Sequence, residues 1–240
     1  NYSSFRPLQK EIIESVLSGK DTLALLPTGG GKSICYQVPA LALEGMCIVV
    51  SPLIALMKDQ VQSLHQKNIE AAAIYTGMPF AQVKDILQLA VNEKLKFLYV
   101  SPERLSTNLF LEYLPGMNVQ LIAVDEAHCI SQWGYDFRPA YLRIADLRNE
   151  LPKVPVLAVT ASATPLVQDD ICRQLQFNNH HIYKGSFLRP NLSFSVFKVE
   201  SRINKILQVL QNVHGSAIGY CKSRRMTQEV AQLLQLQHIS

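Results

Sequence analysis

The sequence predicts an α/β protein with a parallel β-sheet that is covered by helices on both faces. Short apolar runs without polar alternation recur along the chain, and such runs are typical of strands buried on both faces. Segments with helical periodicity separate these runs, which indicates a doubly wound order of strand and helix. Several runs end in polar turns, where open α/β sheets bind their ligands. With 240 residues, 48% of them hydrophobic, the chain can bury a substantial core.

The expected elements alternate in order. Strands are expected at residues 22–26, 46–50, 71–75, 96–100, 119–124 and 154–160, and helices at 10–17, 34–43, 53–65 and 80–91. Residues 176–189 carry few helix signals and are interpreted as a connection. A second α/β unit should then begin, with strands at 192–199 and 216–220 and helices at 203–213 and up to 236. We therefore expect a first domain over residues 1–185 and an incomplete second domain over residues 186–240.

Composition narrows the class of protein. The net charge is +4, which permits nucleic acid as a partner without demanding it. No apolar run approaches the roughly 20 residues that a bilayer-spanning helix needs, so no membrane association is expected. The five cysteines form no C-x-x-C pair and are interpreted as reduced core residues. We expect an intracellular protein, cytoplasmic and nucleoid-associated in a bacterium or nuclear in a eukaryote.

The segment Thr28-Gly29-Gly30-Gly31-Lys32-Ser33 follows the first expected strand and precedes a helix. Consecutive glycines let backbone N–H groups converge on an anion, and the helix adds its positive amino-terminal end. Lys32 can reach the β- and γ-phosphates of ATP, and the Ser33 hydroxyl can bind Mg²⁺. Leu26 occupies the first glycine position of the usual phosphate-loop pattern, so only the Gly-Lys-Ser end matches. A glycine-rich turn without a ligand is the alternative.

The amino-terminal residues Tyr2, Arg6 and Gln9 form a candidate purine site. The tyrosine ring can stack on a base, and the Gln9 carboxamide offers a donor and an acceptor together to the adenine edge. An ordinary helix start with a packed aromatic residue explains the same residues without a ligand.

Asp125 and Glu126 follow an apolar strand, at its expected carboxyl end. There Asp125 can bind Mg²⁺ through water, and Glu126 can orient and deprotonate the attacking water. A solvated acidic turn is the alternative. The polar turns at Ser51-Pro52 and Ser101-Pro102-Glu103-Arg104 can hold the phosphates of a polymer, with Ser51 and Arg104 as candidate DNA contacts. Serine as helix cap with proline at the first helical position is the better explanation of each turn taken alone, and the two interpretations are compatible.

An aromatic segment follows the acids directly. It holds the only tryptophan, Trp133, with Tyr135, Phe137 and Arg138, and its glycine and proline indicate a loop. Exposed aromatic rings beside an arginine are typical of surfaces on which single-stranded bases stack. A loop folded on its own aromatic residues is the alternative. Further on, hydroxyl residues at 160–164 can bridge the acids to neighbouring elements, or Thr164 can simply cap the next helix before Pro165.

Three of these segments together resemble the RecQ DNA helicases of superfamily two: residues 29–33, Asp-Glu-Ala-His at 125–128, and Ser-Gln-Trp-Gly-x-Asp-Phe-Arg-Pro at 131–139. The resemblance implies a first RecA-like domain, the start of a second, 3′-to-5′ translocation on single-stranded DNA, and duplex unwinding in repair or recombination. It implies roles for named residues: adenine recognition by Tyr2, Arg6 and Gln9; ATP and Mg²⁺ chemistry by Lys32, Ser33, Asp125 and Glu126; DNA sensing by Trp133, Phe137 and Arg138; and coupling by His128 and Ser162.

The chain departs from this family pattern in two places. Tyr135 stands where the family usually has histidine, and the usual Thr-Ala-Thr-Ala-Thr is Thr-Ala-Ser-Ala-Thr, which keeps a hydroxyl at Ser162. By the resemblance, arginines that face the γ-phosphate, a four-cysteine zinc module and a winged helix belong to a longer parent chain. An arginine finger supplies about 10³–10⁵ in rate, so we expect these 240 residues to bind ATP, hydrolyse it poorly and not unwind DNA.

Three other functions fit part of the pattern. An RNA helicase of the same superfamily shares the phosphate loop and the acids, but the tryptophan-containing loop argues against it. A nucleotide-dependent DNA-binding module would bind without unwinding. A small-molecule kinase also uses a phosphate loop, but it needs no Asp-Glu-Ala-His followed by an aromatic loop.

Overall fold

The computed structural model describes residues 4–186, 188, 191–213 and 215–237. The chain divides into two compact units, Asn1–Leu188 and Arg189–Ser240, and each is considered by itself. This division falls close to the boundary expected from the sequence, while the extent of the two units as domains stays a prediction. None of the described helices is long and apolar enough to cross a bilayer.

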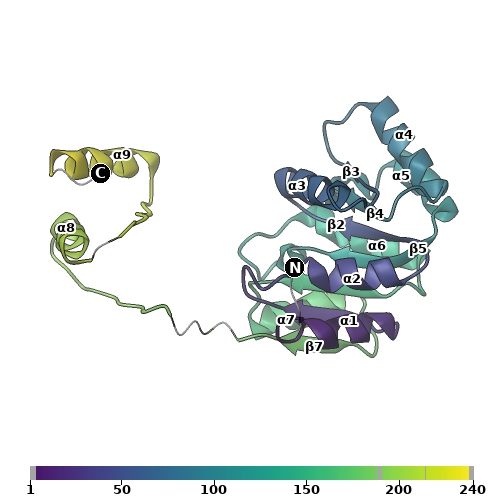
Figure 1. Cartoon of the computed structure of the whole chain (residues 1–240), viewed down its shortest axis with the longest axis horizontal. Helices are drawn as coiled ribbons and strands as arrows, with labels where there is room; N and C mark the ends of the chain where they lie inside the picture. The colour runs from purple at the N-terminus through teal and green to yellow at the C-terminus, as the bar shows by residue number, and fades with distance from the viewer. Residues whose placement is uncertain (1–3, 187, 189–190, 214, 238–240) are drawn as a thin grey trace. The chain divides into compact units, whose positions relative to one another are not determined.

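The first unit is built on a seven-stranded sheet with the order β3-β4-β2-β5-β6-β1-β7 (Figure 1). All of the strand pairs are parallel, which confirms the predicted α/β class. The strands are β1 Thr22–Leu25, β2 Met46–Val50, β3 Ala71–Ile74, β4 Phe97–Val100, β5 Val119–Val124, β6 Val156–Thr160 and β7 His181–Lys184.

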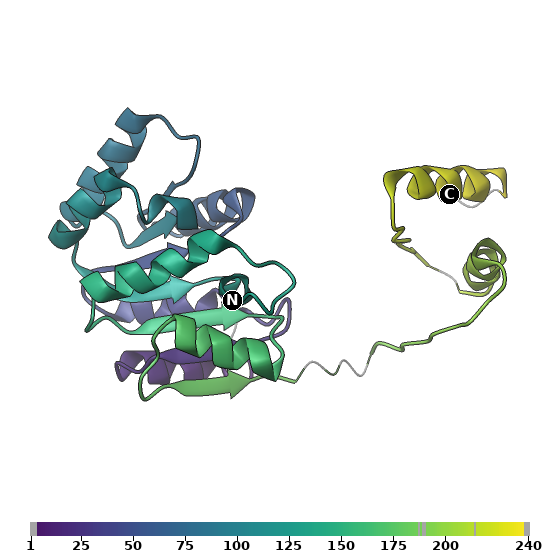
Figure 2. The same ribbon diagram turned by 180° about the vertical axis from the view of Figure 1, so that it is seen from behind.

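Helices cover both faces of this sheet (Figures 1 and 2). One core cluster joins α1 Gln9–Leu17, α2 Ile34–Ala42 and α3 Ile54–His65 to one set of strand residues. A second cluster joins the alternate strand residues to α4 Phe80–Val91, α5 Asn108–Tyr113, α6 Arg143–Glu150 and α7 Pro165–Gln174. In β2, for example, Cys47 and Val49 pack in the first cluster and Ile48 and Val50 in the second. A strand buried on both faces must be apolar throughout, which explains the unbroken apolar runs.

Strand register brings the polar turns together at one edge. Val50 pairs with both Val100 and Val124, so these strands end level with one another. The Asp125 N–H donates to the Val50 carbonyl at 2.9 Å and thereby extends the pairing by one residue. The predicted polar turns therefore lie at the carboxyl edge of the sheet, where ligands of such sheets bind.

Two expectations for the chain after residue 175 are wrong. Residues 181–184, interpreted as a connection, form the edge strand β7, which pairs with β1. Residues 192–199 and 216–220, expected as strands, are irregular and belong to no ladder among the described residues. Alternating apolar residues do not make a strand unless a neighbour pairs with its backbone groups. The second unit does contain the two expected helices, α8 Arg202–Asn212 and α9 Arg224–Leu236.

Candidate functional site

The glycine turn adopts the conformation that its composition predicts. Gly29 and Gly31 have φ of 77° and 78°, in the left-handed region where L side chains are strained. A Cβ on Gly30 would lie 2.8 Å from the Pro27 carbonyl oxygen, so that position has no room for a side chain. Thr28 is exposed in the turn, and Ser33 stands at the amino-terminal end of α2. The turn therefore presents backbone groups and Lys32 at a helix start, as an anion site requires.

Arg6 and Gln9 hold this turn from the amino-terminal side. Gln9 is 4% exposed, and its Nε2 donates to the carbonyls of Gly30 and Gly31 at 3.2 Å each. The Arg6 guanidinium donates to the Gly29 carbonyl, and the Arg6 N–H donates to Gln9 Oε1 at 2.9 Å. Arg6 and Gln9 therefore fix the glycine turn, a role that an ordinary helix start does not have. Their contact with a purine stays a prediction. Tyr2 lies outside the described residues.

The two acids lie opposite Lys32. Lys32 Nζ is 3.3 Å from Glu126 Oε1, and both side chains are largely buried, at 17% and 25% exposure. Asp125 is 8% exposed and accepts the Glu126 N–H on Oδ1 at 3.0 Å. Glu126 has φ 46° and ψ 47°, a left-handed conformation that costs a non-glycine residue about 1–3 kcal/mol. In this conformation the Glu126 carboxylate contacts Lys32 on the glycine turn with Oε1 and lies near His128 with Oε2.

Burial changes the acidity of Asp125. Burial and the neighbouring Glu126 charge raise the pKa of the Asp125 carboxyl to about 6, although Lys32 and the Glu126 N–H oppose the change. Two adjacent carboxylates at a buried edge repel each other, and a cation between them would relieve the repulsion.

One cavity of about 890 Å³ contains these groups. Its lining includes Arg6 and Gln9, the glycine turn with Lys32 and Ser33, and the acids Asp125 and Glu126. This volume lies within the roughly 300–1,000 Å³ usual for ligand sites. The Ser33 hydroxyl and the Asp125 carboxylate are both oxygen donors, the ligand type that Mg²⁺ prefers. The donor set therefore fits a triphosphate with its metal ion.

A hydrogen-bond network leads away from the acids. His128 Nδ1 lies 2.8 Å from the Thr160 hydroxyl at the end of β6 and 3.4 Å from Glu126 Oε2. The Ser162 N–H donates to the same Thr160 hydroxyl at 3.1 Å, so Ser162 enters through its backbone. Thr164 caps α7 by accepting the Val167 N–H, which confirms the capping interpretation. Thr160 is the direct link to His128, a role that was not predicted although the residue belongs to the hydroxyl segment at 160–164.

The aromatic loop, residues 131–139, begins beside these acids. Trp133 is 64% exposed and Tyr135 is fully exposed, which argues against a loop folded on its own aromatic rings. Phe137 is partly exposed. Arg138 pairs with Asp136 at 3.2 Å, and its Nη1 donates to the Pro52 carbonyl after β2 at 3.2 Å. The loop thus presents two rings to solvent and is fixed to the carboxyl edge of the sheet through Arg138.

The structure places two predicted DNA contacts, Ser51 and Arg104, in different surroundings. Ser51 is only 2% exposed, and its burial argues against direct contact with a strand. It does not cap α3, whose N-cap residue is Leu53. Arg104 Nε donates to the Tyr75 carbonyl at 3.0 Å, and Arg104 Nη2 donates to the Met78 carbonyl at 3.2 Å. Arg104 therefore fixes the turn between β3 and α4, and its contact with a phosphate stays a prediction.

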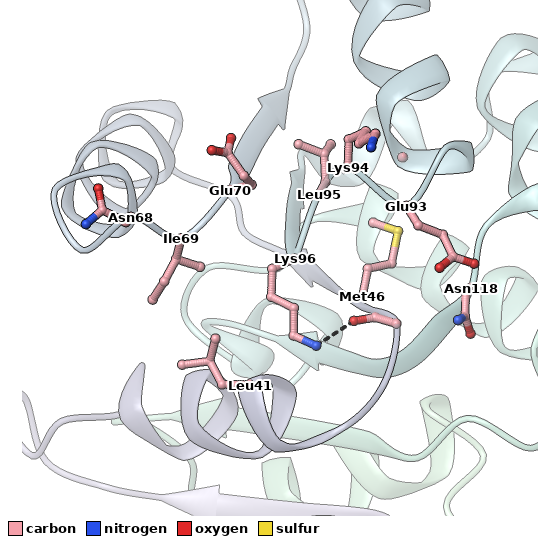
Figure 3. Close-up of a pocket in the computed structure, with 12 residues that line it drawn as sticks. Leu41, Met46, Asn68, Ile69, Glu70, Glu93, Lys94, Leu95, Lys96 and Asn118 are labelled. Carbon is pink, nitrogen blue, oxygen red and sulfur yellow. Dashed lines mark hydrogen bonds between the residues drawn. The ribbon is translucent and has the colours of Figure 1, made fainter.

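A second cavity, of about 400 Å³, lies at the opposite edge of the sheet (Figure 3). Its lining includes residues that directly precede strands: Gly45 before β2, Glu70 before β3, Lys96 before β4 and Asn118 before β5. The Lys96 ammonium donates to the carbonyls of Leu43 and Gly45 at 2.6 and 2.7 Å, and burial lowers its pKa. Lys96 thus closes the α2–β2 connection, away from the glycine turn.

Comparisons with known proteins agree with this geometry. A family model described as DEAD/DEAH box helicase matches residues 6–171. The ATP-dependent DNA helicase RecQ of Haemophilus influenzae is 42% identical over 240 residues, which cover 100% of this chain and 39% of the relative. The putative ATP-dependent RNA helicase R290 of Acanthamoeba polyphaga mimivirus is 42% identical over 97% of this chain and 43% of the relative.

A solved structure agrees on the fold. The Pyrococcus furiosus Hef helicase domain matches with a TM-score of 0.59 at 22% identity, over 78% of this chain and 39% of that one. This match supports the RecA-like fold expected for the first unit. The chain spans about two fifths of the length of the curated relatives. The resemblance to RecQ helicases is confirmed at the level of sequence, and the chain belongs to the DEAD/DEAH box helicase family.

Proposed function

We propose that the chain is the nucleotide-binding part of an ATP-dependent DNA helicase of the RecQ type. The whole protein would couple ATP hydrolysis to 3′-to-5′ movement along single-stranded DNA and to duplex unwinding in repair or recombination. The observation that carries this proposal is the 3.3 Å approach of Lys32 Nζ to Glu126 Oε1 in one cavity, which supports phosphate binding and hydrolysis at a single site.

Different residues would bind the phosphates of ATP, hold Mg²⁺ and activate the attacking water. The backbone N–H groups of residues 29–33 and the Lys32 ammonium bind the β- and γ-phosphates, and Arg6 and Gln9 hold that turn in place. Ser33 and Asp125 would hold Mg²⁺, which neutralises charge that develops on the phosphates. Glu126 orients the attacking water and accepts its proton. Lys32 Nζ lies 3.3 Å from Glu126 Oε1, so the phosphate-binding cation and the acid that activates water act on the same space.

The aromatic loop is the proposed sensor of single-stranded DNA. Trp133 and Tyr135 offer exposed ring faces, which stack on bases at about 1–3 kcal/mol per base. Arg138 joins the loop to the Pro52 carbonyl beside the acids, so stacking on the rings can alter the hydrolytic edge. The zinc module and winged helix of a longer parent chain, and a nucleoid or nuclear location, are further parts of the proposal that rest on the resemblance alone.

RNA is the second candidate substrate, because one relative is named a putative RNA helicase. Stacking on aromatic rings does not by itself distinguish DNA from RNA, since the 2′-hydroxyl carries that distinction. Measuring ATP hydrolysis of the intact protein with single-stranded DNA and with RNA of equal length decides between them. Stronger stimulation by DNA is expected, and stronger stimulation by RNA would overturn the DNA assignment.

The main test uses two substitutions in the intact protein. Lys32→Ala should abolish ATP hydrolysis with and without DNA, because the phosphates lose their cation. Trp133→Ala should leave basal hydrolysis in place and remove its stimulation by single-stranded DNA. Phe80→Ala is the comparison variant, because Phe80 is another exposed aromatic residue, 67% accessible at the start of α4 and outside residues 131–139. Full DNA stimulation in Trp133→Ala would contradict the sensor role.

A further inference from the structure

A second group of metal-ligating side chains lies at the base of the aromatic loop, outside the nucleotide cavity. Cys129 Sγ is 3.9 Å from His128 Nε2 and 3.6 Å from Asp136 Oδ2. One ligand atom from each of the three residues lies within 4.8 Å of the others. We propose that His128, Cys129 and Asp136 form a Zn²⁺ site that closes the aromatic loop at its base.

The two spacings from the Cys129 sulfur suit zinc, and the third, between His128 and Asp136, is within 4.8 Å. With bonds of about 2.0–2.3 Å to nitrogen, oxygen and sulfur, tetrahedral zinc holds its ligand atoms roughly 3.3–3.6 Å apart. The two distances from the thiol sulfur, 3.6 and 3.9 Å, are close to that spacing. A set of one thiolate, one imidazole and one carboxylate leaves the fourth position for water, and the mixture of sulfur and nitrogen favours zinc over magnesium or calcium.

The orientation of His128 supports ligation through Nε2. Its Nδ1 is hydrogen-bonded to the Thr160 hydroxyl at 2.8 Å, and this contact fixes the ring with Nε2 toward the thiol. Zinc-binding histidines typically have such an outer partner on the second ring nitrogen. The Asp136 side chain, 56% exposed, lies on the solvent side of the group and gives an ion its route of entry.

Zinc binding would release one proton and change the contacts at the base of the loop. A Zn–S bond replaces the Cys129 S–H bond, and the thiol proton passes to the buffer. The ion joins residues 128 and 129 to residue 136 and competes with Arg138 for the Asp136 carboxylate, which now lies 3.2 Å from that guanidinium. The segment between the ligands contains Trp133, so zinc changes the setting of the only tryptophan in the chain.

A thiol that donates a hydrogen bond to Asp136 explains the same distances without an ion, and a spectroscopic experiment separates the two. The untagged 240-residue chain is titrated with Zn²⁺ while the fluorescence of Trp133 is followed, and with Co²⁺ while the thiolate-to-cobalt charge-transfer band is followed. We expect saturable changes in both signals. A chain that gives no thiolate–cobalt band, or no saturable response to Zn²⁺, overturns the site.

Matched variants locate the ligands. Cys129→Ser should lose the cobalt band, whereas Cys221→Ser, which alters the most accessible of the five cysteines, should keep it. Asp136→Asn, an exposed change that leaves the core intact, should weaken Zn²⁺ binding at least about tenfold. Asp146→Asn is its control, because Asp146 also pairs with an arginine, at 3.3 Å, and should bind Zn²⁺ as the parent chain does. Loss of the band in Cys221→Ser, or equal affinity in Asp136→Asn and the parent, refutes the assignment.

Discussion

The Ser131 hydroxyl donates a 2.7 Å hydrogen bond to Asp170 Oδ2, and both residues are almost completely buried. This bond ties the first residue of the aromatic loop to α7, the helix that follows β6. His128, three residues before the loop, contacts Thr160 at the end of β6, so residues 128–131 meet the β6–α7 segment at two points. The loop base is therefore a fixed part of the first unit.

Removing this bond should destabilise the first unit. Asp170→Ala leaves the buried Ser131 hydroxyl without its acceptor, which costs about 1–3 kcal/mol. Urea unfolding of the chain measures the loss. Asp169→Ala is the control, because its side chain is exposed on the same helix and its removal should cost less than about 0.5 kcal/mol. Equal stability of the two variants would contradict a structural role for Asp170.

The Asp170 contribution should depend on pH. Burial opposes ionisation, but hydrogen bonds from Ser131, Arg173 and Gln174 outweigh it and lower the pKa of Asp170 below its ordinary value. A lowered carboxyl pKa stabilises the folded state above the unfolded pKa of about 4 and loses that effect as the pH falls below it. The stability difference between the parent and Asp170→Ala should therefore shrink on acidification from pH 7 to 3. A difference that grows on acidification has the wrong sign for this account.

The contribution of Asp125 to stability should have the opposite pH dependence to that of Asp170. Its raised pKa, about 6, means that ionisation is less favourable in the folded chain than in the unfolded one. Stability from this group is present below pH 4 and is lost as the pH rises through 6. Without nucleotide or metal, Asp125→Asn should be more stable than the parent at pH 8, by on the order of 1–3 kcal/mol, with a smaller gain at pH 4.5. Thermal unfolding at both pH values checks this, and a variant less stable than the parent at pH 8 would refute it.

A substitution at Gly31 tests how tightly Gln9 confines the glycine turn. A Cβ at Gly31 would collide with Gln9 Nε2, and the φ of 78° would strain any L residue by about 1–2 kcal/mol. Gly31→Ala should therefore destabilise the chain less in a Gln9→Ala background than in the parent, because only the collision is removed. Unfolding of the four chains in this cycle measures the coupling. Equal costs in both backgrounds would show that Gln9 does not confine the turn.

The sequence was sufficient to locate the central strands. β2 and β5 match the predicted bounds, because strands buried on both faces carry unbroken apolar runs. β7 was missed because it is an edge strand with mostly exposed residues, so only its pairing with β1 defines it. The eight-residue α6 was missed because few of its residues are buried and its periodicity is short. The strands expected in the second unit were wrong because alternation was taken as sufficient without a pairing partner.

The parts of the candidate site that belong to short local motifs could be predicted from the sequence. Lys32, Asp125 and Glu126 belong to short motifs that follow predicted parallel strands. Such motifs lie together at the carboxyl edge of the sheet. The Thr160 contact to His128 joins residues 32 positions apart and depends on strand order, which periodicity does not determine. The contacts of the Arg104 guanidinium with the carbonyls of Tyr75 and Met78 also depend on strand order, and its predicted contact with DNA stays a prediction.

The claim that the glycine turn and the acids form one ATP site is tested most directly by ATP binding to the 240-residue chain. Isothermal titration with ATP and Mg²⁺ is compared for the parent, Lys32→Ala and the exposed control Lys10→Ala, whose ammonium pairs with Glu14 across one helical turn. Loss of a charged hydrogen bond worth about 1.5–3 kcal/mol should weaken ATP binding by about 10- to 150-fold in Lys32→Ala. Lys10→Ala should bind as the parent does. Unchanged ATP affinity in Lys32→Ala would contradict the account.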